Sequence, residues 1–355
     1  MTTPSRTLSA RPGRVARAAL AALALLTAAA STGVAVEAAR ADVSVAAARA
    51  DAPQERPTRL DPERLERGTD ASVPYRDGLD RRDIVEDGVV TRVRADWFQL
   101  LGTRPDGRYV VLAVRGEDHS VRTIAPGGSS SRVLLDDVRG ATALLGTDGT
   151  TVVTERFRSR PRRHTVLRAY DATTGELLGQ RKRRGYTTAL DASSTTVVHA
   201  GENGPVVSWD LATGEGTRVS RRYGYRADLL NDRLAVFTKD PYQGGCTVVS
   251  TLSDPGAELW RSCEEAVLEF SPDGSHVLTV FTLADGLGPS EARVRTVEGE
   301  QVGRYHVDGY LGQLLFEDAD TALLEVATKD SSGLVRCDGR DCELASDLGK
   351  GSPYL

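Results

Sequence analysis

Cys246 and Cys263 are spaced so that a single β-hairpin would bring them together. A turn at Ser253–Gly256 would place Leu252 opposite Ala257, and each outward step along the two strands would keep that register. Cys246 and Cys263 would then lie directly opposite each other, at a Cα separation of about 4.5–5.5 Å, which suits a disulfide. The spacing therefore predicts a disulfide bond between these two residues.

Cys337 and Cys342 flank a second four-residue turn and would close it in the same way. Four cysteines allow three pairings, and the two hairpins select Cys246–Cys263 with Cys337–Cys342. The alternative is a zinc site built from all four thiolates, which would call for the C-x₂-C-like spacing that this chain lacks.

Basic residues are concentrated between residues 156 and 226, although the whole chain has a net charge of −5. Because strands of a repeat alternate in direction, the loops that carry these residues should emerge on one face, beside Tyr186, Tyr223 and Tyr225. We call this surface the basic sector, and an anionic polymer, a phospholipid head group or an acidic protein would suit it. The alternative is a set of solvated loops in an arginine-rich chain. The candidate binding residues are Arg158, Arg160, Arg162, Arg163, Arg181, Lys182, Arg183, Arg184, Arg221 and Arg222.

No pattern in the sequence is typical of an active site or a cofactor site. The chain has no G-x-S-x-G elbow, P-loop or dinucleotide-binding fingerprint. Asp318, Asp320 and Glu325 form an acidic cluster, for which a solvated turn is favoured over a calcium site. We therefore predict no catalytic residue, metal or cofactor. The histidines occur singly and are expected at surface or turn positions: His119, His164, His199, His276 and His306.

The composition excludes several classes of protein. Of 355 residues, 40% are hydrophobic and 27% are charged, and the mean hydropathy is −0.30. These values differ from those of a polytopic membrane protein and of a wholly disordered chain. The net negative charge also argues against a general nucleic-acid binder.

The first 41 residues have the pattern of a secretory signal peptide. Arginines precede an Ala/Leu-rich run from Ala18 to Ala30, and Ala39-Arg40-Ala41 has the small-x-small form of a cleavage site. Residues 42–75 are rich in proline and charge without an apolar period, so we expect a disordered linker there. The protein should be secreted or extracytoplasmic, and it would contact the membrane only through an uncleaved signal sequence.

From residue 76 onwards, short apolar runs alternate with turns, which predicts an all-β domain over 76–355. The turns recur near residues 106, 148, 193, 231, 273 and 319. A repeat of about 40–45 residues with four short strands is typical of a β-propeller. The first strands of six blades are expected at Phe98–Leu101, Ala143–Leu145, Thr188–Leu190, Ala227–Leu230, Val267–Phe270 and Gln313–Phe316.

A second kind of turn recurs inside the repeats. Asp171–Glu176 and Asp210–Glu215 both read Asp-x-x-Thr-Gly-Glu. The aspartate would cap the turn and the glycine tolerates a positive φ, so this turn should join the third and fourth strands of a blade.

These turns are accompanied by Ser271–Gly274 and by the dipeptide Trp209-Asp210. Through these features the sequence resembles WD40-like and TolB-type propellers over about residues 95–350. The resemblance implies an architecture and no activity. Quinoprotein propellers share the Thr-Gly turn but continue with a docking tryptophan, where this chain has Leu177-Leu178-Gly179. No quinone cofactor is therefore expected.

An extra hairpin over Arg82–Val93 precedes the first repeat. We expect it to pair with the last blade, closing the ring and covering an edge that would otherwise invite aggregation. The prediction is thus a propeller of six four-stranded blades, with a seventh, shared blade as the alternative.

These observations favour an exported, non-enzymatic binding or scaffold module at the cell envelope. Its partner would be a protein or an anionic envelope polymer, and not nucleic acid. The alternative is a propeller hydrolase or lyase with its site in the central channel. The expected inner strands are mostly apolar, and Asp191, Asp228 and Glu269 are the only acids near them, which favours binding over catalysis.

Overall fold

The structure, a computed structural model, describes residues 56–77, 82–202, 204–284, 286–352 and 355, which belong to one compact unit. The expected signal peptide and residues 42–55 of the expected linker lie outside the described residues. Within the described ranges, the helices are the single turns η1 (Pro62–Arg64) and η2 (Pro241–Gln243). No helix in this part of the chain has the length and hydropathy needed to cross a membrane.

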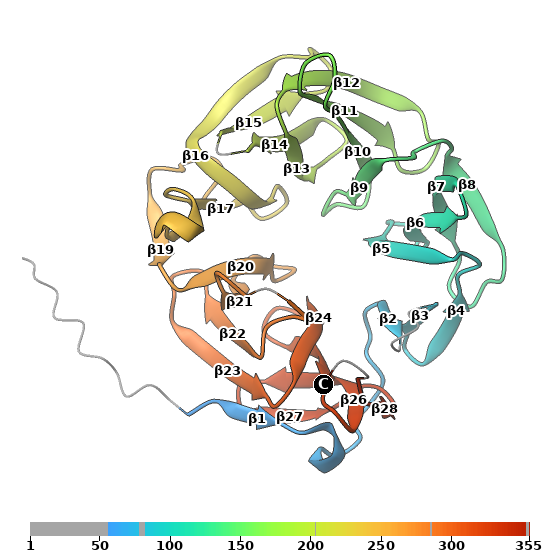
Figure 1. Cartoon of the computed structure of the whole chain (residues 1–355), viewed down its shortest axis with the longest axis vertical. Helices are drawn as coiled ribbons and strands as arrows, with labels where there is room; N and C mark the ends of the chain where they lie inside the picture. The colour runs from blue at the N-terminus through green and yellow to red at the C-terminus, as the bar shows by residue number, and fades with distance from the viewer. Residues whose placement is uncertain (1–55, 78–81, 203, 285, 353–354) are drawn as a thin grey trace, which may run out of the picture. The chain divides into compact units, whose positions relative to one another are not determined.

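Units of four antiparallel strands follow one another along the chain and form a ring (Figure 1). The first two consist of β5 (Trp97–Thr103), β6 (Tyr109–Arg115), β7 (Asp118–Ile124) and β8 (Ser131–Leu135), then β9 (Ala141–Leu145), β10 (Thr151–Arg158), β11 (His164–Asp171) and β12 (Leu177–Arg184). The next two share a strand and comprise β13 (Thr187–Ala192), β14 (Thr196–Gly201), β15 (Pro205–Asp210), β16 (Gly216–Asp228), β17 (Arg233–Phe237), β18 (Thr247–Ser250) and β19 (Glu258–Ser262). The last two are β20 (Glu265–Phe270), β21 (His276–Phe281), β22 (Glu291–Thr296) and β23 (Gln301–Val307), then β24 (Tyr310–Phe316), β25 (Ala322–Ala327), β26 (Ser331–Asp338) and β27 (Asp341–Leu344), with β28 (Gly349–Lys350) beside β26.

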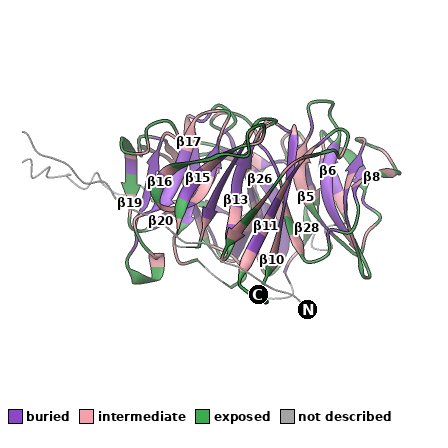
Figure 2. Cartoon of the chain, turned by 90° about the horizontal axis from the view of Figure 1, so that it is seen from above, coloured by how far each residue is buried: buried purple, intermediate pink, exposed green. Residues whose placement is uncertain are grey.

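The predicted fold class, an all-β propeller, is confirmed, and the predicted first strands lie at the start of the units. The second strand of each unit contains a run of consecutive buried residues, as in Tyr109–Arg115, where the first five residues are buried. Such a strand packs against neighbouring units on both of its faces, so β-branched residues suit every position rather than every other one. Figure 2 shows the buried residues along the strands and the exposed residues mainly in the loops.

The strand β16 runs for 13 residues and serves as the outer strand of one unit and the inner strand of the next. It pairs with β15 through its first part and with β17 through Tyr223–Asp228. Gly224 lies where the strand passes between the two ladders, and a Cβ there would come within 2.4 Å of Val206 Cγ2. The sequence placed a blade end here, and the structure instead continues the strand.

The expected extra hairpin forms, as β3 (Asp83–Glu86) and β4 (Val89–Arg92), but its predicted pairing with the last blade is wrong. Its ladder partner is β2 (Tyr75–Asp77), and the three strands make a separate sheet. Sequence reasoning missed β2 because Tyr75–Asp77 contains one apolar residue and so has no alternating pattern. The blade number stays a prediction: six four-stranded units match the six repeats, and β2–β4 occupies a further position in the ring.

Apolar clusters pack each unit against the next. Ile84 and Val93 of the β2–β4 sheet pack against Phe98 and Ile124 of the first four-stranded unit. On its other side, Tyr75 of the same sheet belongs to a cluster with residues of the last unit. Similar clusters lie between the remaining neighbours. The ring is therefore closed by side-chain packing on both sides of β2–β4.

The second half of the expected disordered linker is ordered. The strand β1 (Thr58–Leu60) adds in parallel to β23, and Arg67 forms a parallel bridge with Leu344 of β27. Leu60 and Ala71 are buried. These apolar residues are isolated among prolines and charges, so no period revealed them, but each fills a position against the outer strand of a unit.

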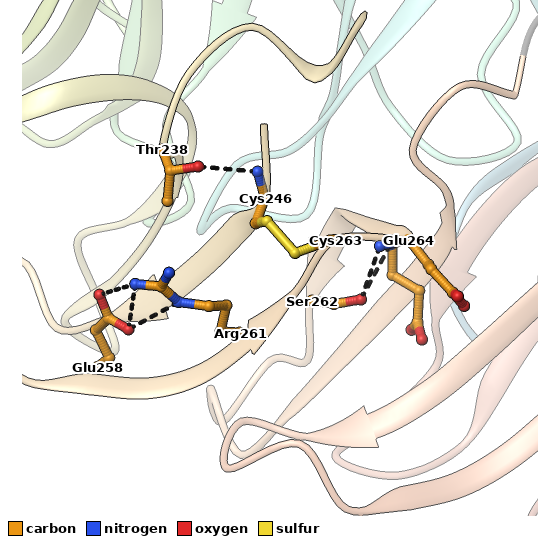
Figure 3. The surroundings of a disulfide bond; sticks show 8 residues. Thr238, Cys246, Glu258, Arg261, Ser262, Cys263 and Glu264 are labelled. Carbon is orange, nitrogen blue, oxygen red and sulfur yellow. Dashed lines mark hydrogen bonds and ion pairs between the residues drawn. A yellow bond between two sulfur atoms is a disulfide. The ribbon is translucent and has the colours of Figure 1, made fainter. Parts of the chain in front are cut away.

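Both predicted disulfides are present. Figure 3 shows Cys246 and Cys263 joined, with Thr238 Oγ1 accepting the N–H of Cys246 at 2.9 Å. The predicted register holds along the strands, where Thr247 faces Ser262. It shifts by a β-bulge after Val249, so the expected pairing nearer the turn does not form. The Cα separation is 4.0 Å for Cys246–Cys263 and 4.2 Å for Cys337–Cys342.

Candidate functional site

The core of the basic sector lies on the unit β9–β12, at one end of its three outer strands. Arg158 pairs with His164 across β10 and β11, and His164 pairs with Arg184 across β11 and β12. The β10–β11 loop and the end of β12 therefore emerge together, as the sequence predicted. The opposite end of the same strands carries the Thr-Gly turn, where Asp171 Oδ1 accepts the N–H of Thr173 at 2.8 Å.

The loop cations are exposed, and none of them has an acidic partner among the residues that the structure describes. Arg163 Cζ lies 5.9 Å from the ring centroid of Phe157, which also contacts Tyr186 edge-on at 5.9 Å. This arrangement fixes one arginine over an aromatic pair at the surface. The exposed cations for which the described residues provide no ion pair are Arg158, Arg160, Arg162, Arg163, Lys182, Arg184 and Arg221.

Arg181 and Arg183 are half-buried and are therefore less accessible to solvent than the loop cations. Arg181 Cζ lies 5.9 Å from the Trp209 ring centroid, and its Nη1 is buried without a hydrogen-bond partner. Burial, followed by repulsion from Arg183, lowers the pKa of Arg181. Gly216 makes room for this guanidinium, because a Cβ there would come within 2.2 Å of Nη2. Arg181 is therefore part of the seam between two units.

The third part of the predicted patch differs from the expectation. Arg221 and Arg222 lie within β16 rather than in a loop. Arg222 Nη1 donates to Glu258 Oε1 at 2.9 Å, so this arginine is already engaged in an ion pair, with a carboxylate that it shares with Arg261. Tyr225 is turned inward, where its hydroxyl contacts Thr247 Oγ1 at 2.9 Å, and burial raises the pKa of Tyr225 to about 12. The sector therefore centres on the unit β9–β12.

An open recess of about 300 Å³ adjoins the sector on the same unit. Arg139, Arg156 and Arg158 line it together with Phe157 and the single acid Asp137. Arg156 Nη2 donates to the backbone oxygen of Asp137 at 3.0 Å, so this guanidinium is held in place by a neutral group. The recess extends the cationic surface beyond the residues that the sequence singled out.

His199 was expected at the surface or in a turn, and this is wrong. It lies on β14 with 1% of its surface exposed, and neither ring nitrogen has a hydrogen-bond partner in the described residues. Burial, with repulsion from Arg183 and Arg181, lowers its pKa to about 3. A lone histidine between Val198 and Ala200 carries no signal of burial in the sequence, whereas the structure places it in a strand that is buried on both faces.

Two of the three acidic residues near the inner strands accept hydrogen bonds from backbone N–H groups. Asp191 accepts the N–H groups of Thr147 at 2.8 Å and of Leu229 at 2.6 Å, which ties three successive units together. Asp228 caps a turn through Asn231. Glu269 lies on β20, and burial raises its pKa to about 7, against the attraction of Arg226.

Comparison with solved structures identifies the fold. An acylaminoacyl peptidase in complex with Z-Gly-Gly-Phe-chloromethyl ketone is similar at a TM-score of 0.57 and 12% identity, over 75% of this chain and 47% of that chain. The Pyrococcus horikoshii acylaminoacyl peptidase is similar at a TM-score of 0.54 and 13% identity, with the same coverage. TolB from Acinetobacter baumannii aligns at a TM-score of 0.41 and 15% identity, over 66% of this chain and 61% of that chain.

The chain thus spans about half the length of the peptidases that it resembles. No protein-family model matches the sequence, and no curated protein does. At these identities the likeness concerns the fold alone. TolB and a WD40 domain, which represent the two propeller types that the sequence resembles, are among the solved structures that match.

Proposed function

We propose that this protein is an exported, non-enzymatic binding module whose basic sector recognises an anionic polymer of the cell envelope. The observation that carries the proposal is the set of unpaired, exposed cations at one end of the unit β9–β12. In a protein with a net charge of −5, these cations create a local positive potential that would attract an anionic polymer.

The neighbouring groups support a polymer rather than a small ligand. The sector is an exposed surface of loop and strand-end cations, and the recess beside it is open. Exposed charges bind an extended polyanion through many weak contacts, each screened by salt. Phe157 and Tyr186 add an aromatic surface beside the cations. A sugar ring of the polymer, or of a unit whose anionic group is bound by the arginines, could pack against it.

The two disulfides support an oxidising compartment, because such bonds persist in secreted and envelope proteins and are rare in the cytosol. The use of Asp191 and Asp228 by the backbone favours binding over the hydrolase or lyase alternative. The proposal therefore assigns the protein a recognition role.

Retention on immobilised polyanions tests the proposal, with heparin as a sulfated polymer and polyglutamate as a carboxylated one. The triple change Arg160→Glu, Arg162→Glu and Arg163→Glu should abolish retention at about 0.15 M salt, where the Debye length is about 8 Å. A matched control alters three exposed cations elsewhere, as Arg56→Glu, Arg132→Glu and Lys350→Glu. Equal loss in both triple variants would show a dependence on net charge alone and would refute a binding role for the sector.

A further inference from the structure

A recess of about 240 Å³ between the sheet β2–β4 and the unit β5–β8 is lined by four arginines. Arg92 ends β4, Arg94 follows it, Arg115 ends β6, and Arg122 lies within β7. The hydroxyl groups of Ser129 and Ser130 in the β7–β8 connection and of Ser131 at the start of β8 complete the lining. None of these residues belongs to the basic sector.

The recess follows from a difference in strand number between the two sheets that meet there. The sheet β2–β4 has three strands, whereas the unit β5–β8 that packs against it has four. The outer strand β8 consequently faces no fourth strand of its neighbour. Val90 on β4 is 56% exposed and Val133 on β8 is 42% exposed, as expected for strands that border an unfilled position.

Two of the guanidinium groups are held in place by neutral oxygens. Arg115 Nε donates to the backbone oxygen of Arg94. Arg122 Nε donates to Ser120 Oγ at 2.9 Å, and its Nη1 donates to Ser131 Oγ at 3.2 Å. Each group keeps further N–H donors and its full charge. Donors that are positioned before a ligand arrives lose less entropy when it binds.

The charges in the recess are poorly compensated. Arg92 pairs with Asp83, through Nη2 and Oδ2 at 3.0 Å. For Arg94, Arg115 and Arg122, the described residues provide no ion pair, and no acid lines the recess. Like charges that converge on one volume repel each other, and an anion between them removes that cost.

We propose that this recess is a binding site for a tetrahedral oxyanion, phosphate or sulfate, either free or carried as an ester on a larger molecule. The planar guanidinium fork matches two oxygens of such an anion at once, and four arginines can surround it from several sides. Serine hydroxyls supply neutral donors to the remaining oxygens. The proposal does not depend on the basic sector, since the two sites share no residue.

Calorimetric titration at constant ionic strength tests this site with inorganic phosphate, sulfate and glycerol 3-phosphate as probes. We expect one saturable site, with affinity at least tenfold lower in the double variant Arg94→Gln, Arg122→Gln. This variant keeps the backbone oxygen of residue 94, which accepts the hydrogen bond from Arg115 Nε. The control Arg132→Gln removes an exposed arginine of β8 that does not line the recess, and its affinity should equal that of the unmodified protein.

A second variant guards against misfolding of the first. Arg122→Lys keeps the charge but loses the fork, so it should bind more weakly than the unmodified protein and more tightly than the double variant. Tighter binding of glycerol 3-phosphate than of phosphate would identify the anion as one carried on a larger molecule, and the reverse order would identify the free ion. Absence of saturable binding for all three probes, or equal affinity in the folded double variant, would overturn the proposal.

Discussion

Arg336 of β26 and Glu317, which follows β24, form a two-point ion pair that holds the N-terminal segment against the last unit. Arg336 Nη2 donates to Glu317 Oε1 at 2.8 Å, and Nε donates to Oε2. The same guanidinium donates to the backbone oxygens of Thr69 and Asp70, each at 3.1 Å. The side chains of Arg336 and Glu317 are 16% and 7% exposed. One half-buried arginine therefore links the residue after β24 and the strand β26 with a chain segment about 270 residues earlier.

Replacement of this arginine, Arg336→Met, should lower the free energy of unfolding by about 3 kcal/mol, because it leaves the buried Glu317 carboxylate without its cationic partner, with the hydrogen bonds from Ser72 remaining. It should also make residues 56–72 more sensitive to protease, as their anchoring hydrogen bonds are lost. Urea unfolding and limited proteolysis measure the two effects. The exposed Arg132→Met is the control, and an equal loss of stability in both variants would contradict the assigned role.

The two disulfides should differ in what they contribute. The bond Cys246–Cys263 closes a loop with a sequence separation of 17, against 5 for Cys337–Cys342. Because a longer loop restricts the unfolded chain more, loss of the first bond should cost about 3 kcal/mol and loss of the second less. Urea unfolding of the paired serine variants measures both. The reverse order would show that native-state contacts outweigh chain entropy here.

His199 should make the protein sensitive to mild acid. Its pKa lies at about 3 in the folded protein, below the ordinary value of 6.5, because burial and then Arg183 and Arg181 disfavour the charged form. The folded state is thus favoured above pH 6.5, and this stability is lost as pH falls toward 3. His199→Leu should flatten the dependence of Tm on pH in that range, whereas His119→Leu should not. Parallel curves for His199→Leu and the unmodified protein would refute the prediction.

Glu269 should have the opposite effect on the pH dependence of stability. Burial raises its pKa to about 7, although Arg226 opposes the shift. A carboxyl group whose pKa is raised on folding favours the folded state below its unfolded pKa, and this contribution is lost as pH rises toward 7. Glu269→Gln should therefore raise Tm at pH 8 and leave it nearly unchanged at pH 4, as scanning calorimetry can determine. A lower Tm at pH 8 would mean that the attraction of Arg226 dominates.

The features predicted from the sequence were those fixed by local chemistry. The Asp-x-x-Thr-Gly turns form as expected, with Asp210 Oδ1 accepting the N–H of Thr213 at 2.7 Å and Gly214 at a φ of 74°. The pairing of Cys246 with Cys263 followed from hairpin register, although a bulge changed the turn. Such features depend on residues a few positions apart, which a sequence displays directly.

What sequence reasoning missed depends on residues that lie far apart along the chain. The stretch from Gly216 to Asp228 has Gly224 as its one interior glycine, and a repeat of separate blades predicts a boundary there, whereas the strand continues through it. The arginine recess combines Arg92 with Arg122 across a boundary between sheets, and no spacing in the sequence marks that contact. The loop cations of the basic sector were found because they are consecutive in sequence.

Because β16 is continuous, the ring does not divide into separate four-stranded units at every boundary. Elsewhere a short loop such as that at Gly185 connects one unit to the next, so new chain ends could be introduced there without breaking a ladder. At the boundary between the two units that share β16 there is no such loop, because every cut within residues 216–228 severs pairing on one side or the other. These two units therefore cannot be separated from each other at a loop, and a dissection into whole units has to keep the seven strands β13–β19 together.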